Sequence, residues 1–156
     1  FEKHILKIPL INSFLINANL ARFTSSLSIL RNSNVPIIEG LNISTSTISN
    51  SFLKSKMNEA LSKVSEGDSL AKSLNKVQEI PLLVIQMIDS GERSGELDSM
   101  LTKAAEYLDQ DFQQSTKIAM NLLEPMVVVL MGSIVASIVV AVLLPLIQMN
   151  NLTLIG

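Results

Sequence analysis

The feature that most constrains this chain is a long uncharged run near its C-terminal end. Residues 126–147, MVVVLMGSIVASIVVAVLLPLI, hold no charged side chain over 22 positions. A helix of that length spans about 33 Å, close to the roughly 30 Å hydrocarbon core of a bilayer. The β-branched residues do not stop such a helix, because no water competes for its backbone groups in lipid. The run therefore predicts a transmembrane helix rather than a buried helix of a soluble protein.

The residues at the start and inside the predicted span, 122–147, support this interpretation. Pro125 is predicted in a first helical turn, where its missing N–H costs nothing, and Glu124 beside the positive helix end at the water boundary. Small residues recur inside the span at four-residue spacing: Gly132, Ser133, Ala136, Ser137 and Ala141. This spacing lets another helix approach closely, and the alternative is that small residues simply face lipid.

The charge distribution predicts how the span is oriented. Residues 1–63 carry a net charge of +4, residues 64–124 carry −6, and residues 125–156 carry no charge. No Lys or Arg follows Lys117. By the positive-inside rule, residues 1–124 are predicted in the cytoplasm and the short tail, 148–156, on the other side of the membrane.

Residues 10–124 have the apolar spacing of helices, and no alternating strand pattern competes with it. The predicted helix faces include Leu20, Phe23, Leu27 and Leu30, then Leu53, Met57, Leu61 and Val64, and finally Leu97, Leu101, Ala104, Leu108 and Phe112. We expect an all-α chain: an entry segment over 1–15, an antiparallel bundle of about six helices over 16–121, and a single transmembrane helix. The last bundle helix is expected to run almost unbroken into the span.

Turn and cap residues separate the predicted helices. Asn34 can adopt the left-handed conformation that ends the first helix, and Pro36 then opens the second. Gly67 is predicted to end the third helix. Three further helix starts are predicted. They are Asn50, then either Asp68 or Ser69 for a short helix through Val77, and finally Pro81.

The stretch IDSGERSGELDSM, residues 88–100, predicts a corner between the fifth and sixth helices. Gly91 is predicted as the left-handed residue that closes the fifth helix, and Gly95 or Ser94 as the cap of the sixth. Glu96 and Asp98 then fall in the first turn, where the helix dipole favours negative charge by about 0.3–1 kcal/mol each. A corner thus explains both glycines and two of the acids without any chemistry.

Glu92 and Arg93 remain in the predicted turn with no structural role. Exposed loop charges are usually only solvated, and the alternative is that this corner binds a partner. The candidate interaction residues are Glu92, Arg93, Glu96 and Glu124.

Composition excludes several kinds of chemistry. The chain has no Cys and one His, which removes thiol catalysis, disulfides and almost every histidine or thiolate metal site. Acids at 106, 109 and 111 could attract a divalent cation, but such a run is more often a solvated helix face. There is no glycine-rich phosphate loop, and scarce aromatics argue against nucleic-acid binding. We therefore predict no catalytic residue, no metal and no cofactor.

Five ordered blocks resemble the type II secretion F-domain family, whose members are inner-membrane platform proteins of type II secretion and type IV pilus assembly. The blocks are KIPLINSF (7–14), ARFTSSLSILRNSNVPIIEGLNIS (21–44), VSEGDSLAKSL (64–74), IPLLVIQMIDSGERSGELDSML (80–101) and LLEPMVVVLMGSIVASIVVAVLLPL (122–146). Asn34 replaces the family's usual Gly, a tolerable change because Asn also adopts left-handed geometry.

This resemblance implies the second cytoplasmic domain and last transmembrane helix of a multi-pass protein of the bacterial inner membrane, with its tail in the periplasm. It implies a non-enzymatic role between a cytoplasmic hexameric assembly ATPase and the pilins or pseudopilins extracted from the membrane. The remaining expected partners are other inner-membrane assembly proteins, membrane lipid and further copies of the chain. Nucleic acid is not an expected partner.

Two rival interpretations stay open from the residues alone. One is a tail-anchored helical adaptor for another cytoplasmic partner. The other is a subunit of a transporter or channel, which is weaker because only Ser133 and Ser137 bring side-chain polarity into the span.

Overall fold

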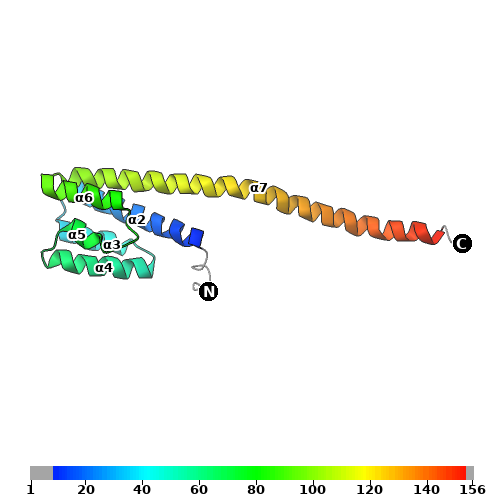
Figure 1. Cartoon of the computed structure of the whole chain (residues 1–156), viewed down its shortest axis with the longest axis horizontal. Coiled ribbons are helices and arrows are strands. Elements are labelled where there is room, and N and C mark those ends of the chain that lie inside the picture. The colour runs from blue at the N-terminus through cyan, green and yellow to red at the C-terminus, as the bar shows by residue number, and fades with distance from the viewer. Residues whose placement is uncertain (1–8, 154–156) are drawn as a thin grey trace. The chain divides into compact units, whose positions relative to one another are not determined.

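A computed structural model describes residues 9–153, which form six helices and contain no strand (Figure 1). The all-α prediction is confirmed over this range. Residues 1–8 of the predicted entry segment and 154–156 of the predicted tail lie outside the described residues. The helices are α2 (Pro9–Asn32), α3 (Ile37–Ser46), α4 (Ser51–Ser65), α5 (Leu70–Leu74), α6 (Leu82–Ser94) and α7 (Leu97–Thr153).

The chain divides into two compact units, Phe1–Ser115 and Thr116–Gly156. The first unit holds α2 to α6 and the first part of α7, and the second holds the rest of α7. The expectation that the last bundle helix runs into the apolar run is confirmed. Glu124 consequently does not lie beside a helix end, and Pro125 lies inside α7 and not in a first turn, so both details of the prediction are wrong. Its ring removes the hydrogen bond that a helical N–H would donate one turn back, a loss that a helix in a membrane tolerates.

The apolar faces predicted for the first unit form its core. Leu27, Leu53, Met57, Leu101 and Ala104 are fully buried, and Phe112 packs against the core while remaining partly exposed. The core also takes residues from α3, α5 and α6, including Leu41, Leu70, Leu74, Val84 and Ile88. Every helix of the unit therefore contributes a buried face, which is the arrangement expected of a helical bundle.

Two left-handed residues end helices as predicted. Asn34 has a φ of 62° just after α2, and Gly67 has a φ of 104° just after α4. Pro36 occupies the cap position before α3, where its fixed φ suits the approach to a helix. These predicted turn residues are confirmed.

Side-chain caps start the next two helices. The Asn50 side chain accepts a hydrogen bond from the Leu53 N–H at 2.9 Å, and the Ser69 hydroxyl accepts one from the Lys72 N–H at 3.1 Å. Of the two residues left open for the start of α5, the structure selects Ser69. The helix ends at Leu74, three residues earlier than predicted.

The first unit has two opposite ends. At one end α2 begins and α7 leaves the bundle, and the rings of Phe14 and Phe112 lie 5.0 Å apart there. At the other end α2 finishes and α7 begins, and Arg31 pairs with Asp98. The two helices therefore run antiparallel. We call these the exit end and the corner end.

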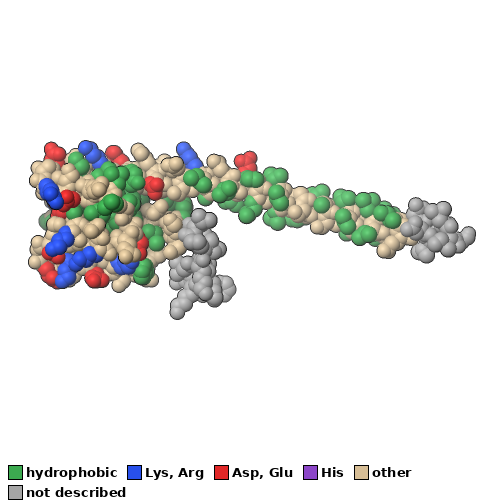
Figure 2. Space-filling model, in the orientation of Figure 1, with side chains coloured by type: hydrophobic (Ala, Val, Ile, Leu, Met, Phe, Trp, Pro, Cys, Tyr) green, Lys and Arg blue, Asp and Glu red, His purple; other side chains and the backbone are tan. Residues whose placement is uncertain are grey.

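Taken by itself, the second unit buries nothing between residues 117 and 148. Every residue in that range is exposed, and the most apolar window of α7 has a mean hydropathy of 3.0 with none of it buried. Its length and composition would allow it to cross a membrane. In Figure 2 charged side chains gather over the bundle, and green hydrophobic side chains recur along this part of α7.

Candidate functional site at the helix corner

The corner between α6 and α7 is formed differently from the prediction. Gly91 lies inside α6 and is buried, and α6 continues to Ser94. Gly95 is the left-handed residue, with a φ of 76°, and its N–H bonds to the Gly91 carbonyl. The prediction that Gly91 adopts left-handed geometry is wrong, and Gly95 ends α6 instead of capping α7.

Gly91 is required for a different physical reason, which is close helix packing. A Cβ atom at this position would lie 2.9 Å from the Leu97 Cα and 2.9 Å from the Met100 Cβ. Real Cβ atoms essentially never come so near, and one of the two atoms belongs to backbone. The absence of a side chain thus lets the end of α6 lie directly on the first turn of α7.

Glu92 has a structural role that the sequence did not indicate. Because α6 runs past Gly91, Glu92 lies on a helix and points toward the start of α5. Its two carboxylate oxygens accept hydrogen bonds from the Leu70 N–H at 2.6 Å and the Ala71 N–H at 2.9 Å. These are N–H groups that a helix cannot pair internally, and a carboxylate beside them is also favoured by the helix dipole. The prediction of a free turn acid is wrong.

Arg93 and Glu96 are the predicted interaction residues whose side chains are exposed at this corner. The Arg93 side chain is 79% exposed, and its Nε lies 3.0 Å from the Asp89 carboxylate. Such an exposed pair one helical turn apart contributes only about 0.2–0.5 kcal/mol. Glu96 immediately precedes α7 and is exposed. Both side chains can therefore reach a partner at little cost to the fold.

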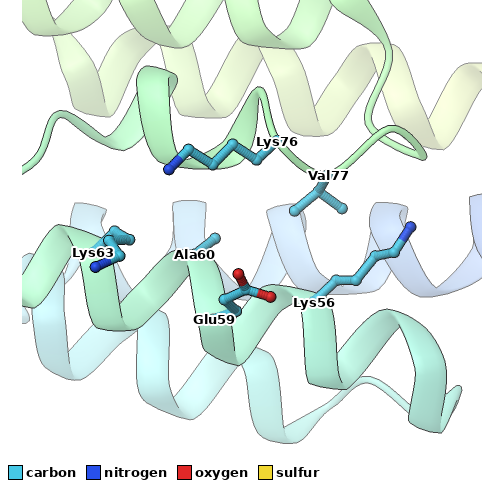
Figure 3. A pocket seen from close by; sticks show the side chains of 6 residues that line it. All are labelled: Lys56, Glu59, Ala60, Lys63, Lys76 and Val77. Carbon is cyan, nitrogen blue, oxygen red and sulfur yellow. The ribbon is translucent and has the colours of Figure 1, made fainter.

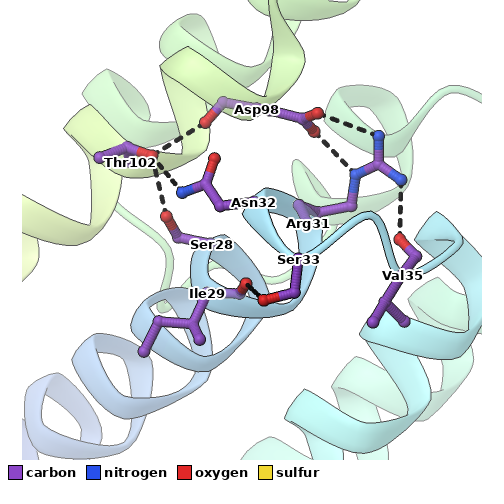
Figure 4. Close-up of polar contacts among 8 residues, drawn as sticks. All are labelled: Ser28, Ile29, Arg31, Asn32, Ser33, Val35, Asp98 and Thr102. Carbon is purple, nitrogen blue, oxygen red and sulfur yellow. Dashed lines mark hydrogen bonds and ion pairs between the residues drawn. The ribbon is translucent and has the colours of Figure 1, made fainter.

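A bidentate ion pair beside the corner was missed by the sequence analysis (Figure 4). Arg31 donates from Nε to Asp98 at 2.7 Å and from Nη2 to the same carboxylate at 3.2 Å. Its Nη1 donates to the Val35 carbonyl at 2.8 Å. This fork geometry is the strong form of an Arg–carboxylate contact. It joins the end of α2, the following turn and the first turn of α7.

Thr102 extends this contact into a polar seam between α2 and α7. Its hydroxyl lies 2.9 Å from the Ser28 hydroxyl and accepts a bond from the Asn32 side chain at 3.2 Å. It also donates to the Asp98 carbonyl at 3.0 Å. Figure 4 shows the side chains of Ser28, Asn32 and Thr102 converging between the two helices. The only signal in the sequence is the repeated Ser and Asn on one face of residues 25–34, which alone does not name a partner.

A separate hollow of about 120 Å³ opens between α4 and the segment after α5 (Figure 3), lined by Lys56, Glu59, Ala60, Lys63, Lys76 and Val77. The Lys56 ammonium donates to Glu79 at 2.7 Å, and Lys63 donates to Glu66 at 2.8 Å. That second bond raises the pKa of Lys63 and lowers the pKa of Glu66. Two of the three lysines are thus paired with carboxylates, and Glu59 also lines the hollow. The lining of the hollow therefore does not favour the binding of an anion.

No cluster of potential metal ligands occurs within residues 9–153. Two of the three acids on the 106–111 face have neutral partners: Asp111 accepts a bond from Asn17, and Asp109 accepts one from Gln113.

The candidate residues of the second unit all lie on the exposed surface of α7. Glu124 precedes the uncharged run, and the small residues follow: Gly132, Ser133, Ala136, Ser137 and Ala141. The hydroxyl of Ser133 donates to the carbonyl of residue 129 at 2.7 Å, and that of Ser137 to the carbonyl of residue 133 at 2.8 Å. Both hydroxyls are satisfied by their own helix, so neither needs a polar partner in an apolar environment.

Comparison with known proteins identifies the family. A family described as "Type II secretion system (T2SS), protein F" matches residues 23–145. The chain belongs to the type II secretion protein F family. It is 41% identical to "Type II secretion system protein F" of Aeromonas hydrophila over 95% of this chain, and 37% identical to the protein of that name in Vibrio cholerae over 97%. It is also 30% identical to "Type IV pilus assembly protein PilC" of Pseudomonas aeruginosa over 96% of this chain.

The resemblance found in the five sequence blocks is thus confirmed. The protein F domain accounts for both units, because the match begins in α2 and ends near the end of the uncharged run. The chain covers 38%, 37% and 40% of the lengths of these three curated relatives, which is less than half in each case.

Proposed function

We propose that this chain is the second cytoplasmic domain and last span of a non-enzymatic platform protein in the bacterial inner membrane. In this role it couples movements of a cytoplasmic assembly ATPase to the extraction of pilins or pseudopilins from the bilayer. The names of the relatives, which cover both type II secretion and type IV pilus assembly, support a task common to the two machines.

The observation that carries the proposal is that α7 is one helix from Leu97 to Thr153. The helix that receives the contacts of the bundle is the same helix that continues into the uncharged run, with no loop between the two. We propose that this continuous helix, which has no flexible linker in it, passes a displacement of the bundle on to the segment in the membrane.

A flexible linker tests this coupling. Several glycines inserted before Pro125 should abolish fibre assembly or secretion while the protein still inserts into the membrane. The matched control carries the same glycines after Gln148, beyond the uncharged run, and should keep its output. Normal output from the first insertion would contradict the proposal.

The positive-inside rule supports residues 1–124 in the cytoplasm and the tail in the periplasm. Because residues 1–156 contain no Cys, a cysteine introduced here is the only thiol in this part of the protein. A cysteine at Ser90 should react with a membrane-impermeant maleimide only after the cells are lysed, and a cysteine at Asn150 should react once the outer membrane is opened. The reverse pattern would overturn the orientation.

We place the contact with the ATPase at the corner end. Residues 97–115 of α7 separate this end from the exit end by about 27 Å of helix, so along α7 the corner end is the farther of the two from the uncharged run. Arg93 and Glu96 are exposed there, and Glu92 positions the corner through α5. Photo-crosslinkers at 93 and 96 should capture the ATPase in cells, whereas one at Lys54 should not. Equal capture from all three positions would reject this surface.

A further inference from the structure

At the exit end, α2 and α7 extend past the buried core of the first unit. Residues 12–18 of α2 and residues 109–115 of α7 include no buried residue. The adjoining Asn19 and Leu108 are only 7% and 2% exposed. Figure 1 shows the start of α2 reaching past α4 and α6. We call these two segments the clasp, because they form a two-helix extension of the bundle outside its core.

The contacts across the clasp are partly open to water. The Asn17 amide donates to the Asp111 carboxylate at 3.3 Å, which is longer than the usual range of about 2.7–3.2 Å for such a bond. The rings of Phe14 and Phe112 lie 5.0 Å apart, with their planes tilted by 37°. All four residues are partly exposed, although Phe112 and Ile16 also touch the edge of the core. Water therefore competes for the hydrogen bond, and the aromatic pair is not sealed from solvent.

The same two helices are joined more firmly at the corner end. Arg31 and Asp98 form their bidentate pair there, and the hydroxyls of Ser28 and Thr102 lie 2.9 Å apart. Ser28 is buried, so this bond is shielded from water, and the neighbouring Leu101 is fully buried in the core. The attachment of α2 to α7 thus weakens from the corner end toward the exit end.

We propose that the clasp opens while the rest of the bundle stays folded: the first turns of α2 leave α7, and the two helices remain joined at the corner end. Segments that bury little surface open at a small fraction of the free energy of global unfolding. The first turns of α2 are too short to be a stable helix without tertiary contacts. Because α7 continues as a helix beyond residue 115 and α2 begins at Pro9, α2 is the helix expected to move.

The clasp would then control how the chain before Pro9 moves. When the clasp is closed, Asn17 and Asp111 hold the start of α2 to α7, so the preceding chain must follow α7. When the clasp is open, the preceding chain and α7 move independently. This inference does not rest on the proposed function, because it concerns contacts inside the first unit alone.

Distances between two spin labels on the full chain test the clasp. One pair of labels, S13C with Q114C, spans the clasp. The reference pair, I29C with K103C, spans the same two helices nearer the corner end, and all four positions are exposed. Double electron–electron resonance should give one narrow distance for the reference pair. For the clasp pair it should give a second population at longer distance.

Two substitutions of Asn17 should shift this population in opposite directions. Asn17→Asp places a second carboxylate beside Asp111 and should enlarge the longer-distance population several-fold, because like charges repel. Asn17→Lys places a cation there and should reduce that population. Neither substitution should alter the reference pair, and thermal unfolding verifies that each variant is folded. If Asn17→Asp does not fold, Asn17→Ala removes the hydrogen bond without adding charge and should still enlarge the longer-distance population.

Three results would overturn the inference. The first is a single narrow distance for the clasp pair in the unsubstituted chain and in the Asn17 variants alike. The second is a longer-distance population for both label pairs, which would mean that the whole bundle is loose. The third is a clasp distribution that no Asn17 variant changes, since the contact with Asp111 would then not hold the clasp closed.

Discussion

The two parts of α7 have the same backbone conformation but are suited to different solvents. Residues 97–115 bury Leu101, Ala104 and Leu108 against the other helices, whereas residues 117–148 bury nothing within the chain. In the first part each buried side chain must fit the shape of the side chains packed around it. In the second part no neighbour within the chain constrains the side chains, and the length and composition of this segment would allow it to cross a membrane. Equivalent substitutions in the two parts should therefore have very different effects on the bundle.

The largest difference is expected for leucine. Leu101 is completely buried, and Leu101→Ala should lower the free energy of unfolding of the bundle by about 2–5 kcal/mol, because it leaves a cavity in a packed core. Leu130 is 60% exposed in the second unit, and Leu130→Ala should leave bundle stability unchanged. Urea unfolding in mild detergent, followed by circular dichroism, measures both. Equal losses would mean that the two parts of α7 do not differ as described.

A smaller difference is expected for glycine. Gly91→Ala should cost about 1–3 kcal/mol, because the new methyl group forces α6 away from α7. Gly132→Ala should cost the bundle nothing, since a methyl group added there meets no neighbouring group within 4 Å. If Gly132 packs against a partner helix, this variant should instead weaken self-association, measured by energy transfer between labelled copies in nanodiscs. A stable Gly91→Ala bundle would show that the corner relaxes easily.

The smallest difference is expected for glutamate. Glu92→Ala should cost about 1–2 kcal/mol, the usual effect of removing a helix cap, because two N–H groups of α5 lose their acceptor. Glu124→Ala, at an exposed position outside the bundle, should not change the unfolding free energy. Hydrogen exchange at Leu70 and Ala71 provides the specific measurement, and it should accelerate only in the first variant. Unchanged exchange there would contradict the capping role.

The Glu92 variant also bears on the proposed function. Glu92→Ala should leave the bundle folded but reduce fibre assembly or secretion, because α5 and the corner are no longer held together. Full output from a variant whose α5 has demonstrably loosened would exclude any contribution of this corner to assembly.

The sequence by itself determined the class of fold, the apolar faces of the bundle, the uncharged run and the family. These depend on local patterns: helical spacing of Leu27 or Met57, the cap at Asn50, and left-handed residues at Asn34 and Gly67. Such signals act within a few residues, so they can be recognised without knowing what lies opposite.

Only the tertiary structure decided the roles of Gly91, Glu92 and Arg31. Each is set by atoms 6 to 67 positions away in the chain: the first turn of α7 for Gly91, the N–H groups of α5 for Glu92, and Asp98 for Arg31. A glycine suits both a left-handed turn and a crowded helix crossing, and an acid suits both water and a helix start. Which role each residue takes depends on the residues packed against it, and these cannot be identified from the neighbouring sequence.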